Sequence, residues 1–441
     1  RRETIGDIDI VAAVEPDDIE AVSAAILSLP GIAEVKGAGE SKVSVILEAS
    51  LFDEGIRLGT LDSGVFDSIG GDDYSSLESS GTIDAQVRMV PPHVFAYTLA
   101  YFTGSKEHNI RLRQRAIDRG LRLNEVGLFP EEEAGELKGL EAAEFSLKAA
   151  TEEDIYRHLE LDWVAPELRE DMGEVEAAES GGLPELVKPT DLKGAFHNHT
   201  TLSDGVATLE QMAGAAMDLD WEFLGIADHS QILNIGGNQI GVMPEDMLAQ
   251  GEQIRTLNET WADGGKDFRI FHGAECDILA DGSLDYDDET RNALTHVVAS
   301  VHQLASWKNR DELENTENLI KAIEDPTCTI LGHPTGRILQ GRDGFPVDLH
   351  AVLRRMGELN SEGELKSVEI NASPYRLDLD WRFLRFARDQ GVPICINPDA
   401  HDTRGLRDVW FGVQIARKGW LRPEDLLNCR SGSELENQFF N

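Results

Sequence analysis

From about residue 190 to residue 441, the chain repeats one pattern of hydrophobic and polar positions. A short apolar segment ends in a polar cluster, and a helical pattern of apolar residues follows. Seven such segments begin near residues 194, 223, 268, 296, 328, 367 and 393. Strands that alternate with helices indicate a parallel sheet, and seven or eight of them over about 250 residues predict a closed α/β barrel. The chemistry of such a barrel lies at the C-terminal ends of its strands.

The first part of the chain has a different pattern. Residues 1–92 contain short alternating apolar stretches and one helical pattern, which predict a small α+β unit with an acidic Gly-, Ser- and Asp-rich insertion at 51–82. Residues 93–150 show a helical pattern. The charged segment 151–189, rich in Glu and Ala, predicts a solvated helical linker to the barrel at 190–441.

Composition narrows the class of protein. The chain has 441 residues, of which 41% are hydrophobic, and no apolar run suggests a membrane span or a secretory leader. We therefore expect a cytoplasmic protein that does not contact a membrane. The four cysteines lie far apart without a CxxC pair, so buried free thiols are expected rather than disulfides.

The charge balance is strongly acidic. Asp and Glu total 81 against 40 Lys and Arg, which gives a formal net charge of −41. A field of this sign repels phosphate backbones, so contact with nucleic acid must be local. Acid-rich surfaces also suit a high-salt cytoplasm, because salt screens their repulsion, and a halophilic origin is one hypothesis.

Metal-binding residue types recur where the predicted strands end. His197 and His199 are two residues apart, so their side chains point to the same side of a strand. The full candidate set is His197, His199, Asp204, His229, Glu275, His302, His333, Asp399 and His401. A single histidine at a strand end is more often a structural hydrogen bonder, but recurrence at strand after strand favours metal binding. Nine nitrogen and oxygen ligands without sulfur suit two or three Zn²⁺, Mn²⁺ or Fe²⁺ ions.

These residues lie in motifs that resemble a known domain. The motifs are His197-x-His199, Asp228-His229-Ser230, Gly273-Ala274-Glu275-Cys276-Asp277-Ile278, Gly332-His333-Pro334-Thr335-Gly336-Arg337, Glu369-Ile370-Asn371 and Asp399-Ala400-His401. They resemble the polymerase and histidinol phosphatase (PHP) domain over roughly residues 190–441. The resemblance implies a distorted (β/α)7 barrel that holds three divalent ions and hydrolyses phosphoesters.

The resemblance also implies how the ligands divide. One ion would lie among His197, His199, Glu275 and Asp399, a second among Glu275, His302 and His333, and a third among Asp204, His229 and His401. Glu275 and Asp399 would be catalytic. Arg337, Arg342 and Arg376 follow ligand-bearing segments and are candidates to clamp a phosphate, with surface ion pairs as the alternative.

The N-terminal part resembles another family. Asp7 and Asp9, in Gly6-Asp7-Ile8-Asp9, form a carboxylate pair suited to Mg²⁺ or Mn²⁺ and phosphoryl transfer. With Tyr101-Phe102-Thr103-Gly104-Ser105-Lys106-Glu107-His108-Asn109 and residues 123–129, this motif resembles the palm and thumb of family X DNA polymerases, some of which carry a C-terminal PHP domain. The thumb-like segment is locally basic, and its expected DNA contacts are Tyr101, Gly104, Lys106, Arg111 and Arg113. The alternative is a solvated helix face.

The palm-like part departs from that family. Glutamine stands at position 86, where the family has its third catalytic carboxylate, and Asp84 would replace it only if the strand register slipped. The family's triphosphate-binding element and helix-hairpin-helix domain find no match in the chain. We therefore expect either a fragment or a palm with impaired polymerase activity.

The expected function is metal-dependent 3′-5′ exonuclease or phosphodiesterase action on DNA in repair, by a monomer. One alternative is a gap-filling family X polymerase that uses the barrel for proofreading. Another is a phosphatase that acts on a small phosphomonoester. A noncatalytic DNA-binding protein fits least well, because buried histidines and carboxylates are costly to keep without a role.

Overall fold

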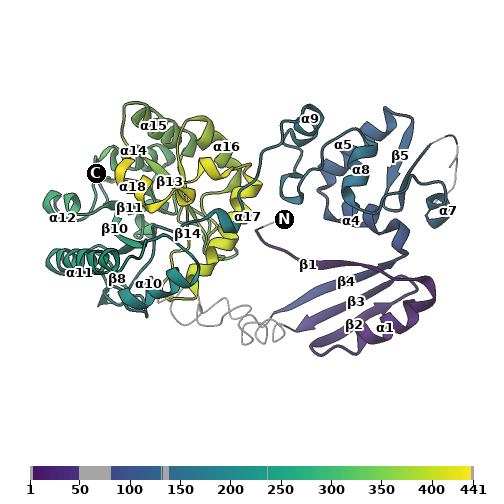
Figure 1. Cartoon of the computed structure of the whole chain (residues 1–441), viewed down its shortest axis with the longest axis horizontal. Helices are drawn as coiled ribbons and strands as arrows, with labels where there is room; N and C mark the ends of the chain where they lie inside the picture. Colours follow the sequence, from purple (N-terminus) through teal and green to yellow (C-terminus); the bar gives the residue numbers. More distant parts are fainter. Residues whose placement is uncertain (1–2, 49–80, 131, 133–138, 236, 439–441) are drawn as a thin grey trace. The chain divides into compact units, whose positions relative to one another are not determined.

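A computed structural model of the chain describes residues 3–48, 81–130, 132, 139–235 and 237–438 (Figure 1). These residues form two compact units, one ending at Pro184 and one beginning at Glu185. Apart from its last two residues, the predicted acidic insertion at 51–82 lies outside the described residues.

A four-stranded sheet with the strand order β1-β4-β3-β2 begins the N-terminal unit. Its elements are β1 (Asp7–Ala13), α1 (Ile19–Leu27), β2 (Ile32–Ala38), β3 (Lys42–Glu48) and β4 (Thr82–Val90). Val43, Val45 and Met89 pack under the apolar side of α1. The opposite face of the sheet carries Asp7, Asp9, Asp84 and Gln86, together with Ile46. β1 and β4 pair in parallel, and the other pairs are antiparallel.

The rest of this unit is mainly helical. It contains α4 (Phe95–Thr103), α5 (Lys106–Ile117), β5 (Leu121–Asn124), β6 (Gly127–Pro130), α7 (Leu140–Ala143), α8 (Glu152–His158) and α9 (Glu174–Ser180). The Ser105 hydroxyl caps α5 by accepting a hydrogen bond from the backbone N–H of His108. β5 and β6 form an antiparallel hairpin.

The prediction of a solvated linker at 151–189 is wrong for residues 151–184, which belong to the N-terminal unit. Ile155, Tyr156 and Leu159 in this segment are each at most 1% exposed. Arg169 is fully buried, and its guanidinium donates two hydrogen bonds, of 2.7 and 3.1 Å, to the Glu152 carboxylate. The apolar side chains and the paired charges of this segment are both removed from water. The segment is therefore a packed part of the N-terminal unit.

The C-terminal unit contains a parallel sheet with the strand order β14-β13-β12-β11-β10-β7. Its strands are β7 (Phe223–His229), β10 (Arg269–Asp277), β11 (His296–Ser300), β12 (Ile330–Leu331), β13 (Ser367–Asn371) and β14 (Ile394–Asn397), and β8 (Asn234–Ile235) and β9 (Asn238–Gln239) form a separate hairpin. The first predicted strand, near residue 194, is not regular. It nevertheless joins both edges of the sheet: Gly225 N–H donates to Ala195 O on one side, and His199 N–H donates to Ala400 O on the other, at 2.7 and 2.8 Å.

Helices surround these strands (Figure 1). They are α10 (Leu209–Asp218), α11 (Pro244–Asp263), α12 (Asp288–Asn292), α13 (Leu304–Lys308), α14 (Glu312–Glu324), α15 (Leu349–Ser361), α16 (Trp381–Asp389), α17 (Val409–Lys418) and α18 (Gly432–Gln438). The main apolar core lies between helices and strands. The predicted fold class, an α/β barrel after a small α+β unit, is therefore confirmed.

Two further expectations concern cysteines and membranes. All four cysteines are free, and Cys276, Cys328 and Cys395 are buried. Among the described residues, no helix combines the length and the apolar character that crossing a membrane requires.

Candidate metal centre

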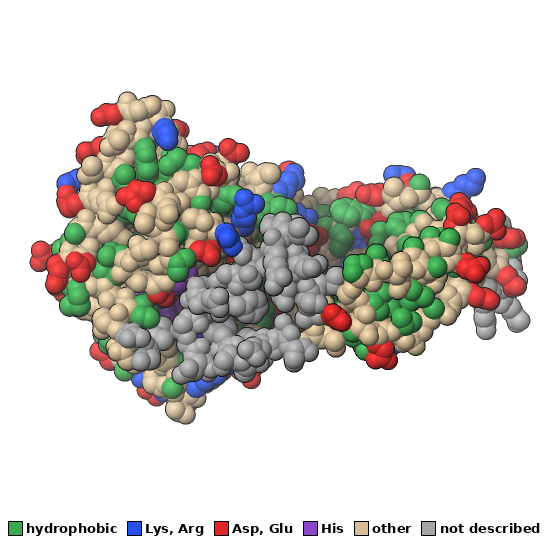
Figure 2. All heavy atoms as spheres, turned by 90° about the horizontal axis from the view of Figure 1, so that it is seen from below, with side chains coloured by type: hydrophobic (Ala, Val, Ile, Leu, Met, Phe, Trp, Pro, Cys, Tyr) green, Lys and Arg blue, Asp and Glu red, His purple; other side chains and the backbone are tan. Residues whose placement is uncertain are grey.

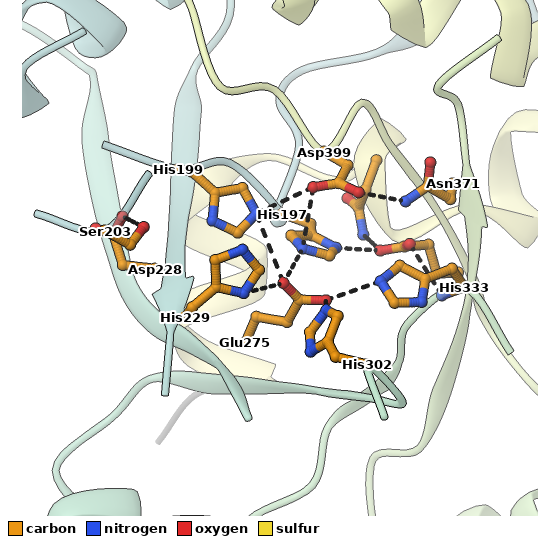
Figure 3. A network of polar contacts seen from close by, with 12 residues as sticks. His197, His199, Ser203, Asp228, His229, Glu275, His302, His333, Asn371 and Asp399 are labelled. Atoms are coloured by element: carbon orange, nitrogen blue, oxygen red, sulfur yellow. Dashed lines mark hydrogen bonds and ion pairs between the residues drawn. The ribbon is translucent and has the colours of Figure 1, made fainter. Parts of the chain in front are cut away.

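The C-terminal ends of the barrel strands bring all nine predicted ligands into one cluster. Figure 3 shows seven of them: His197, His199, His229, Glu275, His302, His333 and Asp399. His229 ends β7, Glu275 lies in β10, and His302, His333 and Asp399 each follow a strand by two residues. Parallel strands end at the same edge of a sheet, so positions far apart in the sequence meet there. Among the described residues, three groups have ligand atoms within 4.8 Å of one another: His199, Asp204, His229 and His401; His197, His199 and Glu275; and His229, Glu275 and His302.

Glu275 is the central carboxylate of this cluster and is 1% exposed. Its Oε2 lies 2.9 Å from His229 Nδ1 and 3.2 Å from His197 Nε2. Its Oε1 lies 2.8 Å from His333 Nε2 and 3.2 Å from His302 Nε2. Because each oxygen faces different imidazoles, this carboxylate is placed to bridge ions.

Asp204 and Asp399 face the remaining imidazoles. Asp204 Oδ2 lies 3.4 Å from His229 Nε2 and 3.3 Å from His401 Nε2. Asp399 Oδ1 lies 3.0 Å from His199 Nε2. Histidine side chains are visible at the surface of this unit (Figure 2), and the side chains of Asp204 and His401 are 20% and 25% exposed. The cluster is therefore open to solvent on this side.

The cluster strongly shifts the pKa values of its members. Burial raises the pKa of the Glu275 carboxyl, but His302, His197 and His229 together hold it well below its usual range. Burial opposes protonation of His302, yet the carboxylates of Glu275 and Asp277 raise its pKa to about 9. Burial, with His401 and His229 nearby, lowers the pKa of His199 to about 4. Carboxylates and imidazoles packed this closely can accept divalent ions in place of protons.

Three polar residues outside the predicted set orient its members. Glu369 Oε2 lies 2.8 Å from His197 Nδ1, Asp277 Oδ1 lies 3.1 Å from His302 Nδ1, and Asn371 Nδ2 donates to Asp399 Oδ2 at 3.0 Å. Contacts of this kind fix which ring nitrogen faces a metal. Strand alternation carried a signal for one of them, since Asp277 lies two residues after Glu275 on the same strand.

Asp228 organises the loop that carries Asp204. This fully buried carboxylate accepts hydrogen bonds from the backbone N–H and the hydroxyl of Thr200, both at 2.7 Å. It also accepts from the Ser203 hydroxyl at 2.5 Å (Figure 3) and from Gln250 Nε2 at 2.6 Å. These hydrogen bonds from Thr200 and Ser203 to Asp228 fix the position of the loop before Asp204.

The predicted phosphate-clamping arginines differ in their surroundings. The Arg337 guanidinium donates to the Asp380 carboxylate at 2.7 Å and to the backbone oxygens of Arg376 and Leu377. These contacts fit the alternative in which Arg337 forms an ion pair within the protein rather than clamping a phosphate. Arg376 lies closer to the cluster, with its Nε 3.8 Å from Asp399 Oδ2.

On the face of the N-terminal sheet that points away from α1, Asp7 pairs in register with Asp84, and Asp9 pairs with Gln86. The register does not slip, so an amide stands beside Asp9. Lys36 Nζ lies 2.5 Å from Asp84 Oδ1 and neutralises that carboxylate. Asp7, Lys36, Asp84 and Gln86 line a cavity of about 560 Å³.

The basic segment of α5 faces a run of acidic side chains within its own unit. Arg111 pairs with Glu176 and Asp171, Arg115 with Glu179, and Arg119 with Glu160. Arg111 and Arg115 lie four residues apart on α5, and Arg119 continues this spacing just after the helix ends at Ile117, so the three form one arginine stripe. Of the other expected DNA contacts, Lys106 and Tyr101 are exposed. The Nε of Arg113 donates a hydrogen bond to Asn109 O. Gly104 has a positive φ of 65°.

Comparisons with known proteins agree with both halves of this description. The family model "DNA polymerase beta thumb" matches residues 98–170. "DNA polymerase/3'-5' exonuclease PolX" from Bacillus subtilis is 34% identical over 435 residues, which cover 99% of this chain and 66% of the relative. This chain therefore spans about two thirds of the length of that relative.

Shorter relatives match part of the chain. A probable phosphatase from Thermoanaerobacter sp. is 30% identical over 37% of this chain and 65% of its own length. A probable phosphatase from Caldicellulosiruptor saccharolyticus is 27% identical over 46% of this chain and 78% of its own length. The similarity to PolX along nearly the whole chain, the thumb match and the barrel with its histidine cluster show that this chain belongs to the PolX family, which joins a family X polymerase to a PHP domain.

Proposed function

We propose that the barrel hydrolyses phosphodiester bonds at the 3′ ends of DNA and uses three divalent ions to do so. The observation that carries this proposal is the convergence of six imidazoles and two further carboxylates around the buried Glu275. The printed name of the B. subtilis relative, a 3′-5′ exonuclease, supports the same reaction.

The proposed ligand sets follow the chemistry of the donors. His197, His199, Glu275 and Asp399 would hold one ion, Glu275, His302 and His333 a second, and Asp204, His229 and His401 a third. Such ions lower the pKa of a water molecule, neutralise the nonbridging phosphate oxygens and stabilise the leaving oxygen. Donors without sulfur suit Zn²⁺, Mn²⁺ or Fe²⁺.

The protein groups around the ligands have separate tasks in this proposal. Glu369 and Asp277 hold the rings of His197 and His302 with their Nε2 atoms toward Glu275. Arg376, beside Asp399, is placed to contact an incoming phosphate.

We propose that the palm-like sheet no longer extends primers and that the N-terminal unit contributes DNA contacts instead. A polymerase palm needs carboxylates to hold two ions. Here Gln86 offers an amide instead, and the Asp84 carboxylate is paired with the Lys36 ammonium group. Because the stripe Arg111, Arg115 and Arg119 is paired with carboxylates, Lys106 and Arg113 are the stronger candidates for phosphate contacts. The proposed setting is repair of DNA 3′ ends in the cytoplasm by a monomer.

Digestion of end-labelled DNA tests this proposal. A duplex labelled at its 3′ or 5′ end is incubated with Mn²⁺ and the wild type, His197→Ala or Asp7→Ala, with His350→Ala as a control at an exposed histidine. We expect 3′ label loss to disappear in His197→Ala alone. Loss of digestion in Asp7→Ala would assign the activity to the palm.

The second candidate function is hydrolysis of a small phosphomonoester. The similarity to proteins named probable phosphatases favours it. If the wild type leaves DNA intact at low and at high salt but hydrolyses p-nitrophenyl phosphate in a His197-dependent manner, this candidate replaces the first.

Gap-filling synthesis remains the third candidate, because Asp7 and Asp9 share one face of β1. Primer extension by the wild type that Asp7→Ala abolishes would establish it.

A further inference from the structure

A cavity of about 410 Å³ lies beside the loop that carries Asp204. Its lining comes from two places, the loop and helix start around Thr200–Glu210 and one side of α11. Thr200, Leu202 and Leu209 form part of the first wall, and Gln250 and Gln253 form part of the second. This volume is within the usual range for small-molecule sites.

The cavity is close to the metal centre along the chain and in space. Leu202 lines it and is two residues from Asp204, so their Cα atoms are at most about 7.6 Å apart. The loop is tight: Gly205 N–H donates to Thr200 O at 3.0 Å, and Val206 N–H donates to the backbone oxygen of His401 at 2.7 Å. One loop therefore presents Asp204 to the cluster and Leu202 to the cavity.

The charge of the lining excludes a phosphate and admits a neutral ring. The described residues that line the cavity include the carboxylates of Glu210 and Asp246 but neither lysine nor arginine. Carboxylates repel phosphate and accept hydrogen bonds from N–H groups. A phosphate is thus directed to the metal centre rather than into this cavity.

The remaining lining suits a flat ring with polar edges. Leu202, 37% exposed, and the buried Leu209 offer apolar surface. Gln250 is 5% exposed, and its amide nitrogen donates to Asp228, which does not line the cavity. The Gln250 carbonyl oxygen is buried and has no hydrogen-bond partner among the described residues.

We propose that this cavity receives the terminal nucleobase of the DNA strand being shortened, while the adjoining phosphate faces Asp204 and the metal centre. The inference rests on the proposed exonuclease function and adds a specificity site to it. Enzymes that do chemistry on a base take it out of the stack into a pocket and bind it there by stacking and hydrogen bonds. The site would distinguish a nucleotide end from a phosphate without a base.

The test compares two substrates and two variants. The substrates are 3′-recessed duplexes that end either in thymidine or in an abasic tetrahydrofuran residue. Leu202→Ser removes the apolar wall, and Leu313→Ser, at an exposed leucine of α14, is the matched control. We expect Leu202→Ser to lower kcat/KM roughly tenfold on the thymidine end and to leave the abasic end unchanged, because a lost apolar contact weakens only the base-bearing substrate. Activity on the abasic end also shows that the variant is folded.

A second measurement does not depend on turnover. With Ca²⁺ in place of Mn²⁺, a duplex that ends in 2-aminopurine should gain fluorescence on binding to the wild type and to Leu313→Ser, and gain less with Leu202→Ser. Equal kcat/KM on both ends, with Leu202→Ser behaving as Leu313→Ser, would overturn the base site and leave the exonuclease in place. A wild type that shortens neither substrate would overturn both.

Discussion

Substitution of Glu369 tests how the metal centre is built, because this residue belongs to none of the proposed ligand sets and yet orients one of their histidines. Glu369 Oε2 accepts hydrogen bonds from His197 Nδ1 at 2.8 Å and from Asn397 Nδ2 at 2.9 Å. Its Oε1 accepts from the backbone N–H of His333 at 3.1 Å. Glu369 is fully buried, so water cannot replace these contacts.

The change Glu369→Gln keeps the size of the side chain and removes one acceptor oxygen. The glutamine oxygen can face His197 and Asn397 or it can face His333, so at least one of the three donors loses its partner. An unsatisfied buried donor costs about 1–3 kcal/mol of unfolding free energy. Loss of an orienting contact to a metal-binding histidine typically weakens metal binding by about 10–100-fold.

Metal-linked stability measures this effect. At a Mn²⁺ concentration of 100 times the wild-type Kd, one site stabilises the fold by about 2.7 kcal/mol, and a 100-fold weaker site stabilises it by about 0.4 kcal/mol. Chemical unfolding with and without Mn²⁺, together with calorimetric titration, gives both quantities, and Glu362→Gln on the exposed end of α15 is the matched control. A Glu369→Gln protein that binds Mn²⁺ as tightly as the control would refute the orientation argument.

Other predictions concern the palm, the buried ion pair and a barrel histidine. Gln86→Asp places a third carboxylate beside Asp9, so Mg²⁺ should bind at least about tenfold more tightly in calorimetry. Unchanged Mg²⁺ affinity would contradict the proposal that Gln86 weakens ion binding by the palm-like sheet. Arg169→Met leaves Glu152 without its partner and should lower the free energy of unfolding by about 3–5 kcal/mol in urea, with Mn²⁺ affinity unchanged. Burial lowers the pKa of His296 to about 4, so the unfolded chain takes up a proton between pH 6.5 and 4 where the folded chain does not. Stability should therefore fall by roughly 3 kcal/mol as the pH drops through this window, and His296→Gln should flatten the slope.

Period-two alternation explains why much of the histidine and carboxylate cluster could be predicted from the sequence. It placed His197 and His199 on one side of a segment. Alternation also places Cys276, the neighbour of Glu275, on the opposite side of β10, where its thiol is buried in the apolar core. The same reasoning did not predict that residues 194–199 lack regular strand geometry. There the Asn198 side-chain amide donates a hydrogen bond to Gly225 O at 2.9 Å and supplements the backbone hydrogen bonds. No local pattern in the sequence predicts this contact.

Long-range pairing explains what the sequence concealed. Glu174 lies in a segment whose composition suggests solvent, but it is fully buried because His108 Nδ1 lies 2.6 Å away, 66 residues earlier in the chain. Arg169 likewise depends on Glu152. Composition reports the average preference of a segment for water, whereas burial of a charge depends on one partner whose position only the fold determines.

Charge pairing also bears on how so acidic a chain would approach DNA. The net charge is −41, and the stripe of Arg111, Arg115 and Arg119 is already matched by carboxylates of its own unit. The loaded metal centre would be different, because three divalent ions against the three ligand carboxylates and the two orienting carboxylates, Glu369 and Asp277, leave a local charge of about +1. Attraction would then be confined to the residues that hold the ions, and the rest of the surface would repel the duplex. Under the proposed function, an acidic protein of this kind would select DNA ends at its metal centre rather than by wrapping the backbone, and the proposed base pocket beside Asp204 would then add discrimination.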